Sequence, residues 1–346
     1  MSLFNQPPKS LCILRLSAIG DVCHALAAVQ QIQDFYPECK ITWIIGKTEA
    51  SLLSAITQGI EFVVYDKKTG WHGVWNLWKT LKNQQFDALL NMQTAFRASI
   101  LSLGIKAKIK LGFGKKRSRE GQGLFVNYRI SDPQSPHVLD GLLAFAQSIG
   151  VPIQSPYWHI QLAETDKYIV NQYVDPQRKN LLISPCSSKV EKDWLTERYA
   201  ELANWANQQG FNVILSGSNA VREQKTIEKL TALCDFHPTN TAGKTTLPQL
   251  AALIQSVDLV ISPDSGAAHI ATMVGTPVIG LYAYHNPLRT GPYYNLANVV
   301  SVYEQHALKE FGKSSAELPW ATKLKGENLM ADISVEQVKT KIMTFK

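Results

Sequence analysis

The chain has 346 residues, of which 45% are hydrophobic and 18% are charged, and its formal net charge is +7. These values are typical of a soluble globular protein with about two domains, and no apolar run reaches the roughly 18–20 residues of a membrane span. A basic chain binds nucleic acid, anionic membranes or acidic substrates, and the sequence lacks any helix-turn-helix or RNA-binding signature, which argues against nucleic acid.

Strands alternate with helices along the first half of the chain. In order, the apolar patterns predict strand, helix, strand, strand, helix, strand and helix at 11–16, 22–35, 41–45, 62–65, 74–83, 86–92 and 137–149. This alternation indicates βαβ units with a parallel sheet, whose ligands bind at the carboxyl ends of the strands. A segment rich in Gly and Pro, 150–156, ends this half.

The same alternation restarts in the second half. In order, the predicted strand, helix, strand and helix cover 181–184, 198–208, 213–216 and 221–233, and a further segment at 247–255 precedes the strand, helix and strand at 257–261, 267–274 and 278–282. We therefore predict two α/β domains that join within about 155–178, followed by a last helix at 335–345.

The turn from strand 257–261 into helix 267–274 is suited to binding an anion. Asp264 and Ser265 are of N-cap type, and Gly266 lets the backbone approach a ligand closely. Such a turn directs free N–H groups and a positive dipole end at one spot, where diphosphate is stabilised. An ordinary βα turn with a good cap is the alternative.

A family resemblance rests on three stretches. Residues 262–269 read Ser-Pro-Asp-Ser-Gly-Ala-Ala-His, with Gly-Thr-Pro six residues after the His, and resemble the nucleotide-sugar site of the lipopolysaccharide heptosyltransferases. Residues 17–24 resemble the N-terminal motif of that family, and 184–194 resemble its phosphate-binding loop more loosely. The resemblance implies a GT-B fold, with two Rossmann-like domains facing across a cleft. It assigns 1–165 to acceptor binding, 166–325 to nucleotide-sugar binding, and 326–346 to a C-terminal helix that packs back on the first domain.

Asp21 lies where the first predicted strand turns into the first helix. Capping that helix is one role, which contributes about 1 kcal/mol. Accepting a proton from a hydroxyl during sugar transfer is the other role, and the resemblance implies this one, with Asp21 as the catalytic base. The stretch lacks GxGxxG, and the chain lacks a P-loop, so neither hydride transfer nor P-loop phosphoryl transfer is supported.

Hydroxyl and lysine side chains follow the first strand of the second domain. They suit a phosphate, although a plain polar loop is the alternative. Lys189 is an alternative to Lys192 as the lysine that contacts the phosphate. For Glu223, the alternative to binding the ribose is an ordinary acidic residue at a helix N-terminus. For His269, the alternative to binding the donor is a structural role. The donor-binding residues that the resemblance implies are Ser187, Ser188, Lys192, Glu223, Asp264, Ser265, Gly266 and His269.

Seven lysines and arginines fall within the fourteen residues 106–119. A solvated charged face is the usual explanation for such a cluster, and a dock for anionic head groups or phosphorylated acceptors is the alternative. The resemblance implies an acceptor side that includes Arg97, Lys115 and Arg119. It also points, more weakly, to Lys67 and Lys68.

The tryptophans and the cysteines bear on location. Trp71, Trp75 and Trp78 have helical spacing, which favours packing or a membrane-surface contact over a sugar platform. The five cysteines lack a CxxC pair, and 1–10 lack the features of a signal peptide, so we expect a cytoplasmic protein without disulfides or a zinc site. Peripheral contact with the cytoplasmic face of the inner membrane is part of this expectation.

The resemblance implies an inverting glycosyltransferase that moves a heptose from an ADP-heptose-type donor to the lipopolysaccharide inner core, a Kdo-lipid A type acceptor. The expected partners are the nucleotide-sugar donor and an anionic lipid-linked sugar acceptor, with ADP as product, no required cofactor, no metal, and a monomeric enzyme. A non-catalytic nucleotide-sugar-binding or scaffold protein and a GT-B-like sugar-nucleotide epimerase are the alternatives.

Overall fold

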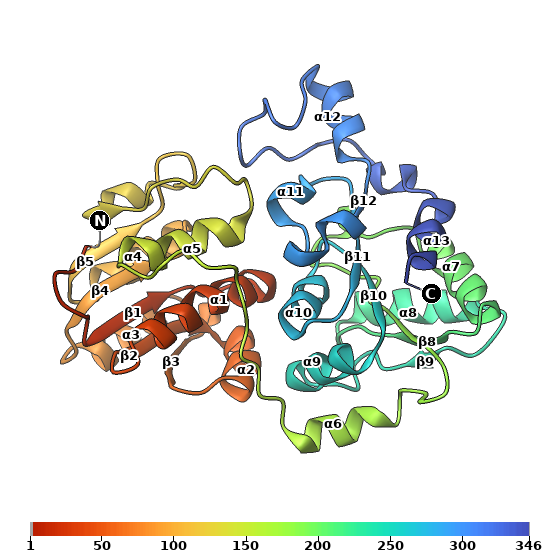
Figure 1. Ribbon diagram of the computed structural model, residues 1–346, viewed down its shortest axis with the longest axis horizontal. Helices are drawn as coiled ribbons and strands as arrows, with labels where there is room; N and C mark the ends of the chain where they lie inside the picture. The colour runs from red at the N-terminus through yellow and green to blue at the C-terminus, as the bar shows by residue number, and fades with distance from the viewer. Residues whose placement is uncertain (1–2, 346) are drawn as a thin grey trace. The chain divides into compact units, whose positions relative to one another are not determined.

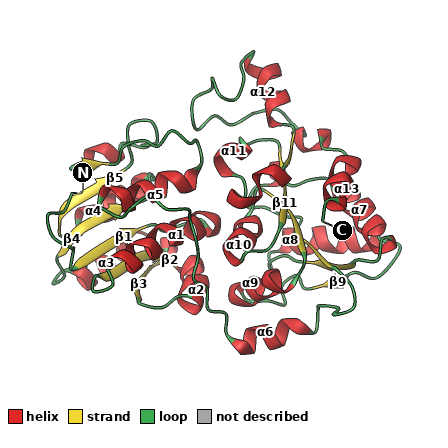
Figure 2. Cartoon of the chain, viewed as in Figure 1, coloured by secondary structure: helices red, strands yellow, loops and turns green. Residues whose placement is uncertain are grey.

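The computed structural model describes residues 3–345, which form two compact units, the first ending at Gln161 and the second beginning at Leu162 (Figure 1). Each unit contains one six-stranded parallel sheet with helices on its faces (Figure 2). The boundary predicted after residue 165 lies inside helix α6, Glu164–Asn171. The units divide earlier because α6 packs against α9, Leu247–Ser256, of the second unit.

The first sheet has the strand order β3-β2-β1-β4-β5-β6. Its strands are β1 Ser10–Leu14, β2 Lys40–Gly46, β3 Ile60–Tyr65, β4 Phe86–Asn91, β5 Ala107–Gly112 and β6 Tyr128–Arg129. Its helices are α1 Ile19–Phe35, α2 Lys47–Ile56, α3 Gly70–Leu81, α4 Phe96–Leu103 and α5 Val138–Ser148, with the short 3₁₀ turns η1 Lys67–Thr69 and η2 Gln122–Leu124. The order reverses between β1 and β4, which is where ligands bind in such folds.

The centre of this sheet explains why the first strand is apolar throughout. Residues 11–14 are fully buried, as expected for a parallel strand covered on both faces. Helices α3 and α4 pack on one face, while α1 and α5 pack against each other on the opposite face. Leu14 pairs with both Ile44 and Asn91, so the loops after β1, β2 and β4 leave the same edge of the sheet.

The second sheet has the order β12-β11-β10-β7-β8-β9. Its strands are β7 Asn180–Ile183, β8 Asn212–Leu215, β9 Thr239–Asn240, β10 Leu259–Pro263, β11 Val278–Tyr282 and β12 Val300–Ser301. The remaining elements are α7 Thr196–Gln208, α8 Val221–Ala232, α10 Gly266–Val274, α11 Pro287–Thr290, α12 Tyr303–Phe311 and α13 Val335–Met343, with the 3₁₀ turns η3 Val190–Lys192, η4 Tyr293–Asn298 and η5 Leu329–Asp332. Here the order reverses between β7 and β10.

The last helix belongs to the core of the second unit. Its apolar face, Val335, Val338 and Ile342, is buried in the core of the second unit, where α13 lies against α7, β11 and β12. The segment before it is held there too, because Trp194 Nε1 donates to the carbonyl of Ile333 at 3.0 Å. This helix therefore completes the second core, and its expected packing on the first domain stays a prediction.

Two further findings concern helices. The helix predicted at 74–83 begins earlier, at Gly70, because η1 leads into it and Asp66 accepts the N–H of Lys68 at 2.9 Å.

Across residues 3–345, no helix combines the length and the apolar composition that crossing a bilayer demands.

Candidate active site

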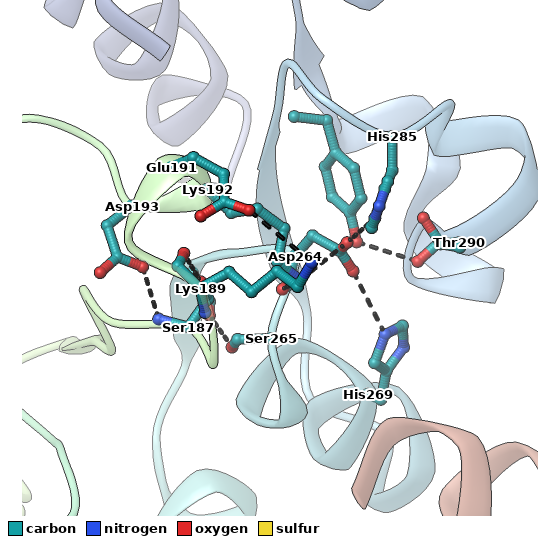
Figure 3. Close-up of polar contacts among 12 residues, drawn as sticks. Ser187, Lys189, Glu191, Lys192, Asp193, Asp264, Ser265, His269, His285 and Thr290 are labelled. Carbon is teal, nitrogen blue, oxygen red and sulfur yellow. Dashed lines mark hydrogen bonds and ion pairs between the residues drawn. The ribbon is translucent and has the colours of Figure 1, made fainter. Parts of the chain in front are cut away.

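Four ionisable side chains meet at the carboxyl ends of β7 and β10, where the second sheet reverses its order. Figure 3 shows Lys192, His269 and His285 converging on Asp264 from three different segments. Lys192 Nζ lies 3.1 Å from Asp264 Oδ2 and donates to the Asp264 carbonyl at 2.7 Å. His285 Nδ1 lies 2.6 Å from the same carboxylate oxygen, and His269 Nε2 lies 3.9 Å from Oδ1. The result is a buried carboxylate surrounded by nitrogen donors.

These neighbours keep Asp264 ionised. Burial alone raises the pKa of a carboxyl group, because it disfavours the charged form. Here His269, His285 and the ammonium of Lys192 outweigh burial and hold the pKa of Asp264 well below its usual range. Asp264 is therefore an anion that fixes the position of Lys192 across the physiological pH range.

The Asp264→Asn variant is expected to lose about 3 kcal/mol of unfolding free energy at pH 7, because the buried Lys192 loses its counter-charge. Since the folded pKa of Asp264 is depressed, its stabilisation is complete above the unfolded value of about 3.9 and is lost as the pH falls through the folded value. Urea unfolding at pH 7 and at about pH 3 measures both effects. An equal difference between wild type and variant at the two pH values would contradict this assignment.

Helix α10 begins without a side-chain cap. The backbone of Ser265 is extended at the N-cap, and its hydroxyl bonds Ser262 Oγ at 2.6 Å instead of the first-turn N–H groups. By contrast, α9 is capped by Thr246, whose side chain accepts from the N–H of Gln249. The first N–H groups of α10, from Gly266 onward, are therefore positioned to bind an anion at the positive end of the helix dipole.

The loop before η3 is held by a second network. Ser187 is buried, its N–H donates to Asp193 Oδ1 at 2.6 Å, and its hydroxyl donates to the carbonyl of Lys189 at 2.7 Å. Arg222 binds both the Asp193 carboxylate and the Ser187 carbonyl. Burial raises the pKa of Asp193, against the opposing effect of these donors. Ser187 therefore shapes the loop with its own hydrogen bonds.

The structure separates the two rival lysines. The Lys192 side chain is only 12% exposed and contacts Asp264, whereas the Lys189 side chain is 55% exposed and lies 3.8 Å from Glu191. Lys192 is therefore the lysine that the fold brings to the start of α10.

Ser188 and Glu223 lie at the same edge of the sheet but outside the Asp264 group. Ser188 is exposed in the loop after β7. Glu223 lies in the first turn of α8, and its Oε2 accepts the N–H of Ser218 at 2.7 Å. That bond closes the loop after β8, which neighbours β7 in the sheet.

In the first unit, Asp21 lies in the first turn of α1. Its Oδ2 accepts the N–H of Ala18 at 3.1 Å and lies 2.5 Å from an Arg15 guanidinium nitrogen. A second bond fixes the position of Arg15, because its other terminal nitrogen donates to the carbonyl of Met92 at 2.6 Å. The Asp21 side chain is 38% exposed and that of Arg15 only 13%, so the carboxylate is the member of the pair that solvent reaches.

A cavity of about 640 Å³ opens at the same edge of the first unit. The loops after β1, β2, β3 and β4 form its walls. Basic and acidic side chains both face it, and burial raises the pKa of one of them, Glu49. The charged residues on its walls are Lys47, Glu49, Asp66, Lys67, Lys68, Arg97 and Glu120.

Comparisons with known proteins identify the family. Residues 74–321 match the family model described as glycosyltransferase family 9 (heptosyltransferase). The chain is also 69% identical over 338 residues to the lipopolysaccharide core heptosyltransferase OpsX of Haemophilus influenzae, which covers 98% of this chain and 97% of that protein. The chain belongs to glycosyltransferase family 9. It is thus a glycosyltransferase of the heptosyltransferase type, as the resemblance implied.

Solved structures agree on the fold of this family 9 enzyme. A family 9 glycosyltransferase from Veillonella parvula superposes with a TM-score of 0.79 at 22% identity, covering 97% of each chain. The E. coli heptosyltransferase WaaC with ADP superposes with a TM-score of 0.73 at 18% identity, covering 97% of this chain and all of that one. Together with the two Rossmann-like sheets, these likenesses confirm the predicted GT-B fold class.

The basic cluster 106–119 is not a single surface of this enzyme. Arg117 is only 3% exposed and donates to the carbonyl of His137 at 2.8 Å, which is a structural role. Lys110 donates to the carbonyl of Ser102 at 2.7 Å, and Arg119 Nη1 to that of Ser118 at 3.1 Å. The linear run of charge therefore divides between the interior and the surface.

The three predicted acceptor residues occupy different environments. Arg97 lines the cavity of the first unit. Lys115 and Arg119 are exposed but are not among the residues that line it, although Glu120, next to Arg119, does. Lys67 and Lys68, which the sequence pointed to more weakly, face the cavity directly.

Sequence reasoning missed His285 and Arg15, which contact the predicted site residues Asp264 and Asp21. His285 follows β11, and only the pairing of β11 with β10 shows that it reaches Asp264. Arg15 follows the apolar strand β1 directly, and a lone charge at that place was a signal that could have identified it.

Proposed function

We propose that this enzyme transfers a heptose from ADP-heptose to the inner core of lipopolysaccharide, with inversion at the anomeric carbon. The near full-length identity to OpsX of H. influenzae, a lipopolysaccharide core heptosyltransferase, carries this proposal. The presence of ADP in the structure of the family relative WaaC supports an adenine nucleotide as the carrier. The enzyme is proposed to act at the cytoplasmic face of the inner membrane.

The second unit is proposed to hold the donor. The N–H groups at the start of α10 bind the diphosphate, while Glu223 binds the ribose and His269 adds a donor contact. Lys192 Nζ has three hydrogens and uses two on Asp264, which leaves one for a phosphate oxygen. These groups also stabilise the charge that develops on the departing ADP. Ser187 is proposed to fix the shape of the loop beside this site, and Ser188 to lie at its border.

The first unit is proposed to hold the acceptor. The cavity with Lys67, Lys68 and Arg97 on its walls suits an acidic, phosphorylated sugar. Asp21 accepts the proton of the attacking hydroxyl as the new C–O bond forms at the anomeric carbon and the bond to the diphosphate breaks. Lys115 and Arg119 are proposed to contact outer parts of the same anionic acceptor.

The direct test is turnover of purified enzyme with ADP-heptose and a Kdo-lipid A acceptor. Turnover is measured as ADP release and as the mass of the lipid product. We expect one heptose added per ADP released. Conversion of the donor without acceptor would indicate an epimerase instead. Donor binding without release of ADP in the presence of any acceptor would indicate a non-catalytic binding protein.

Metal independence is part of the proposal, because Lys192 and the start of α10 supply the positive potential that a cation supplies elsewhere. In the described part of the chain, no group of three His, Cys, Asp or Glu side chains could hold a metal ion. Activity in excess EDTA is therefore expected to stay within about twofold of the untreated rate. Complete loss of activity that Mg²⁺ restores would refute this part.

A further inference from the structure

Helix α3 exposes two tryptophans although its inner face is fully packed. Val74, Leu77 and Leu81 are buried, whereas Trp71 and Trp75 are each 66% exposed. These two lie four residues apart and therefore share one side of the helix. Large apolar side chains gathered on an exposed face mark an interaction site more often than scattered ones do.

The third tryptophan of this helix serves a different purpose. The indole N–H of Trp78 donates to the carbonyl of Leu101 on α4 at 3.0 Å, and its ring packs edge-to-face on Trp75 with centroids 5.7 Å apart. Trp78 thus joins α3 to α4 and packs against the ring of Trp75. Packing explains Trp78 but leaves Trp71 and Trp75 unexplained.

Between Asp66 and Asp87, the segment that carries these tryptophans has charge of one sign. Residues 67–86 contain four lysines and no Asp or Glu, and all four lysines are exposed. Within residues 3–345, none of these ammonium groups lies within ion-pair distance of a carboxylate. Exposed tryptophan beside unpaired lysine is the composition of helices that lie in the interface of an anionic bilayer. The lysines are Lys67, Lys68, Lys79 and Lys82.

This surface adjoins the proposed acceptor cavity. Lys67 and Lys68 in η1 line the cavity, and the chain runs from η1 directly into the first turn of α3, where Trp71 lies. Phe96 begins α4, also lines the cavity and is exposed. A lipid-linked sugar held by its lipid in a bilayer projects from the membrane surface, so an anchor here presents the cavity to it.

We propose that the outer face of α3, formed by Trp71, Trp75, Lys79 and Lys82, binds the surface of an anionic phospholipid bilayer. The indole rings insert at the level of the head groups, and the lysines bind the lipid phosphates. This inference rests on the proposed function only in that it assigns the membrane as the place where the acceptor is met.

Co-sedimentation of the full chain with vesicles tests the proposal. We expect binding to vesicles of phosphatidylethanolamine and phosphatidylglycerol, weaker binding at high salt, and little binding to phosphatidylcholine vesicles. The double variant Trp71→Ser/Trp75→Ser is expected to lower the partition coefficient at least about tenfold, and Lys79→Glu/Lys82→Glu to remove the preference for anionic lipid.

The matched control is Tyr168→Ser on α6, which removes an even more exposed aromatic side chain in the second unit and is expected to bind vesicles like wild type. Thermal unfolding of each variant shows that the fold is retained. Unchanged partitioning of the double tryptophan variant would overturn the proposal. A wild-type dimer that the tryptophan substitutions dissociate, without any vesicle binding, would overturn it in favour of a protein interface.

Activity measurements with a soluble and with a vesicle-bound acceptor distinguish this inference from the proposed function. With a water-soluble delipidated acceptor, the tryptophan variant is expected to retain wild-type turnover, and with the acceptor in vesicles it is expected to slow at least about fivefold. Vesicle binding without any sugar transfer would refute the proposed function and leave the anchor intact. Transfer to the soluble acceptor without vesicle binding would refute the anchor alone.

Discussion

The Asp21→Asn variant is expected to lose about a thousandfold in kcat, because general base catalysis contributes roughly 10²–10⁴ in rate. Asn keeps an oxygen that can accept the Ala18 N–H, so the start of α1 is preserved. The variant loses the carboxylate, which is the group that accepts the proton and which is both 38% exposed and paired with Arg15. Steady-state ADP release with both substrates saturating measures the effect.

The control for this prediction lies on the same helix. Asp34 is near the other end of α1, where it accepts the hydroxyl of Tyr157 at 2.6 Å and lies 3.4 Å from His159. Asp34→Asn is therefore expected to keep wild-type kcat. An Asp21→Asn enzyme that retains more than about a tenth of the wild-type rate would rule out the base role and leave helix capping as the function of Asp21.

The second large effect is expected for Lys192→Ala. Removing one donor that stabilises developing charge costs about 10²–10³ in kcat, and the loss of a phosphate contact should weaken ADP binding as well. The affinity for adenosine, which carries no phosphate, should stay close to wild type. Calorimetric titration with ADP and with adenosine, combined with turnover measurements, separates the phosphate contact from general damage.

Lys189→Ala is the matched control, because Lys189 lies three residues away, carries the same charge and contacts Glu191 instead of Asp264. It is expected to change ADP affinity by less than about threefold, as is usual for an exposed pair. If the losses were reversed between the two variants, Lys189 would be the phosphate ligand.

Local patterns in the sequence were sufficient to predict the elements that carry the proposed donor site. The apolar strand and small-residue helix around 259–274 appear in the structure as β10 and α10, and Gly275 ends the helix with a left-handed φ of 84°. Lys192, Asp264 and His269 were all named from the sequence and lie together. Their proximity has a simple cause, since residues at the ends of neighbouring parallel strands share an edge.

Contacts that depend on tertiary structure could not be predicted in this way. The burial of Arg117 within a run of surface lysines follows from its bonds to the carbonyls of Ser135 and His137, which no local pattern reveals. Lys47 reaches the first-unit cavity because β2 lies beside β1, and His285 reaches Asp264 because β11 lies beside β10. The placement of α13 depended on which core had an apolar surface left to cover, and this too is a global property.

The pairing of Lys192 with Asp264 has a consequence for selectivity among cellular anions. In the proposed donor site, an anion that reaches Lys192 shares it with Asp264, a counter-ion that never leaves the protein. Free phosphate or sulfate would therefore meet a charge that is already largely neutralised, whereas the proposed nucleotide sugar would add contacts from its base, ribose and sugar. After the proposed transfer, departure of the nucleotide would leave Lys192 still paired with Asp264, with no bare positive charge in the protein.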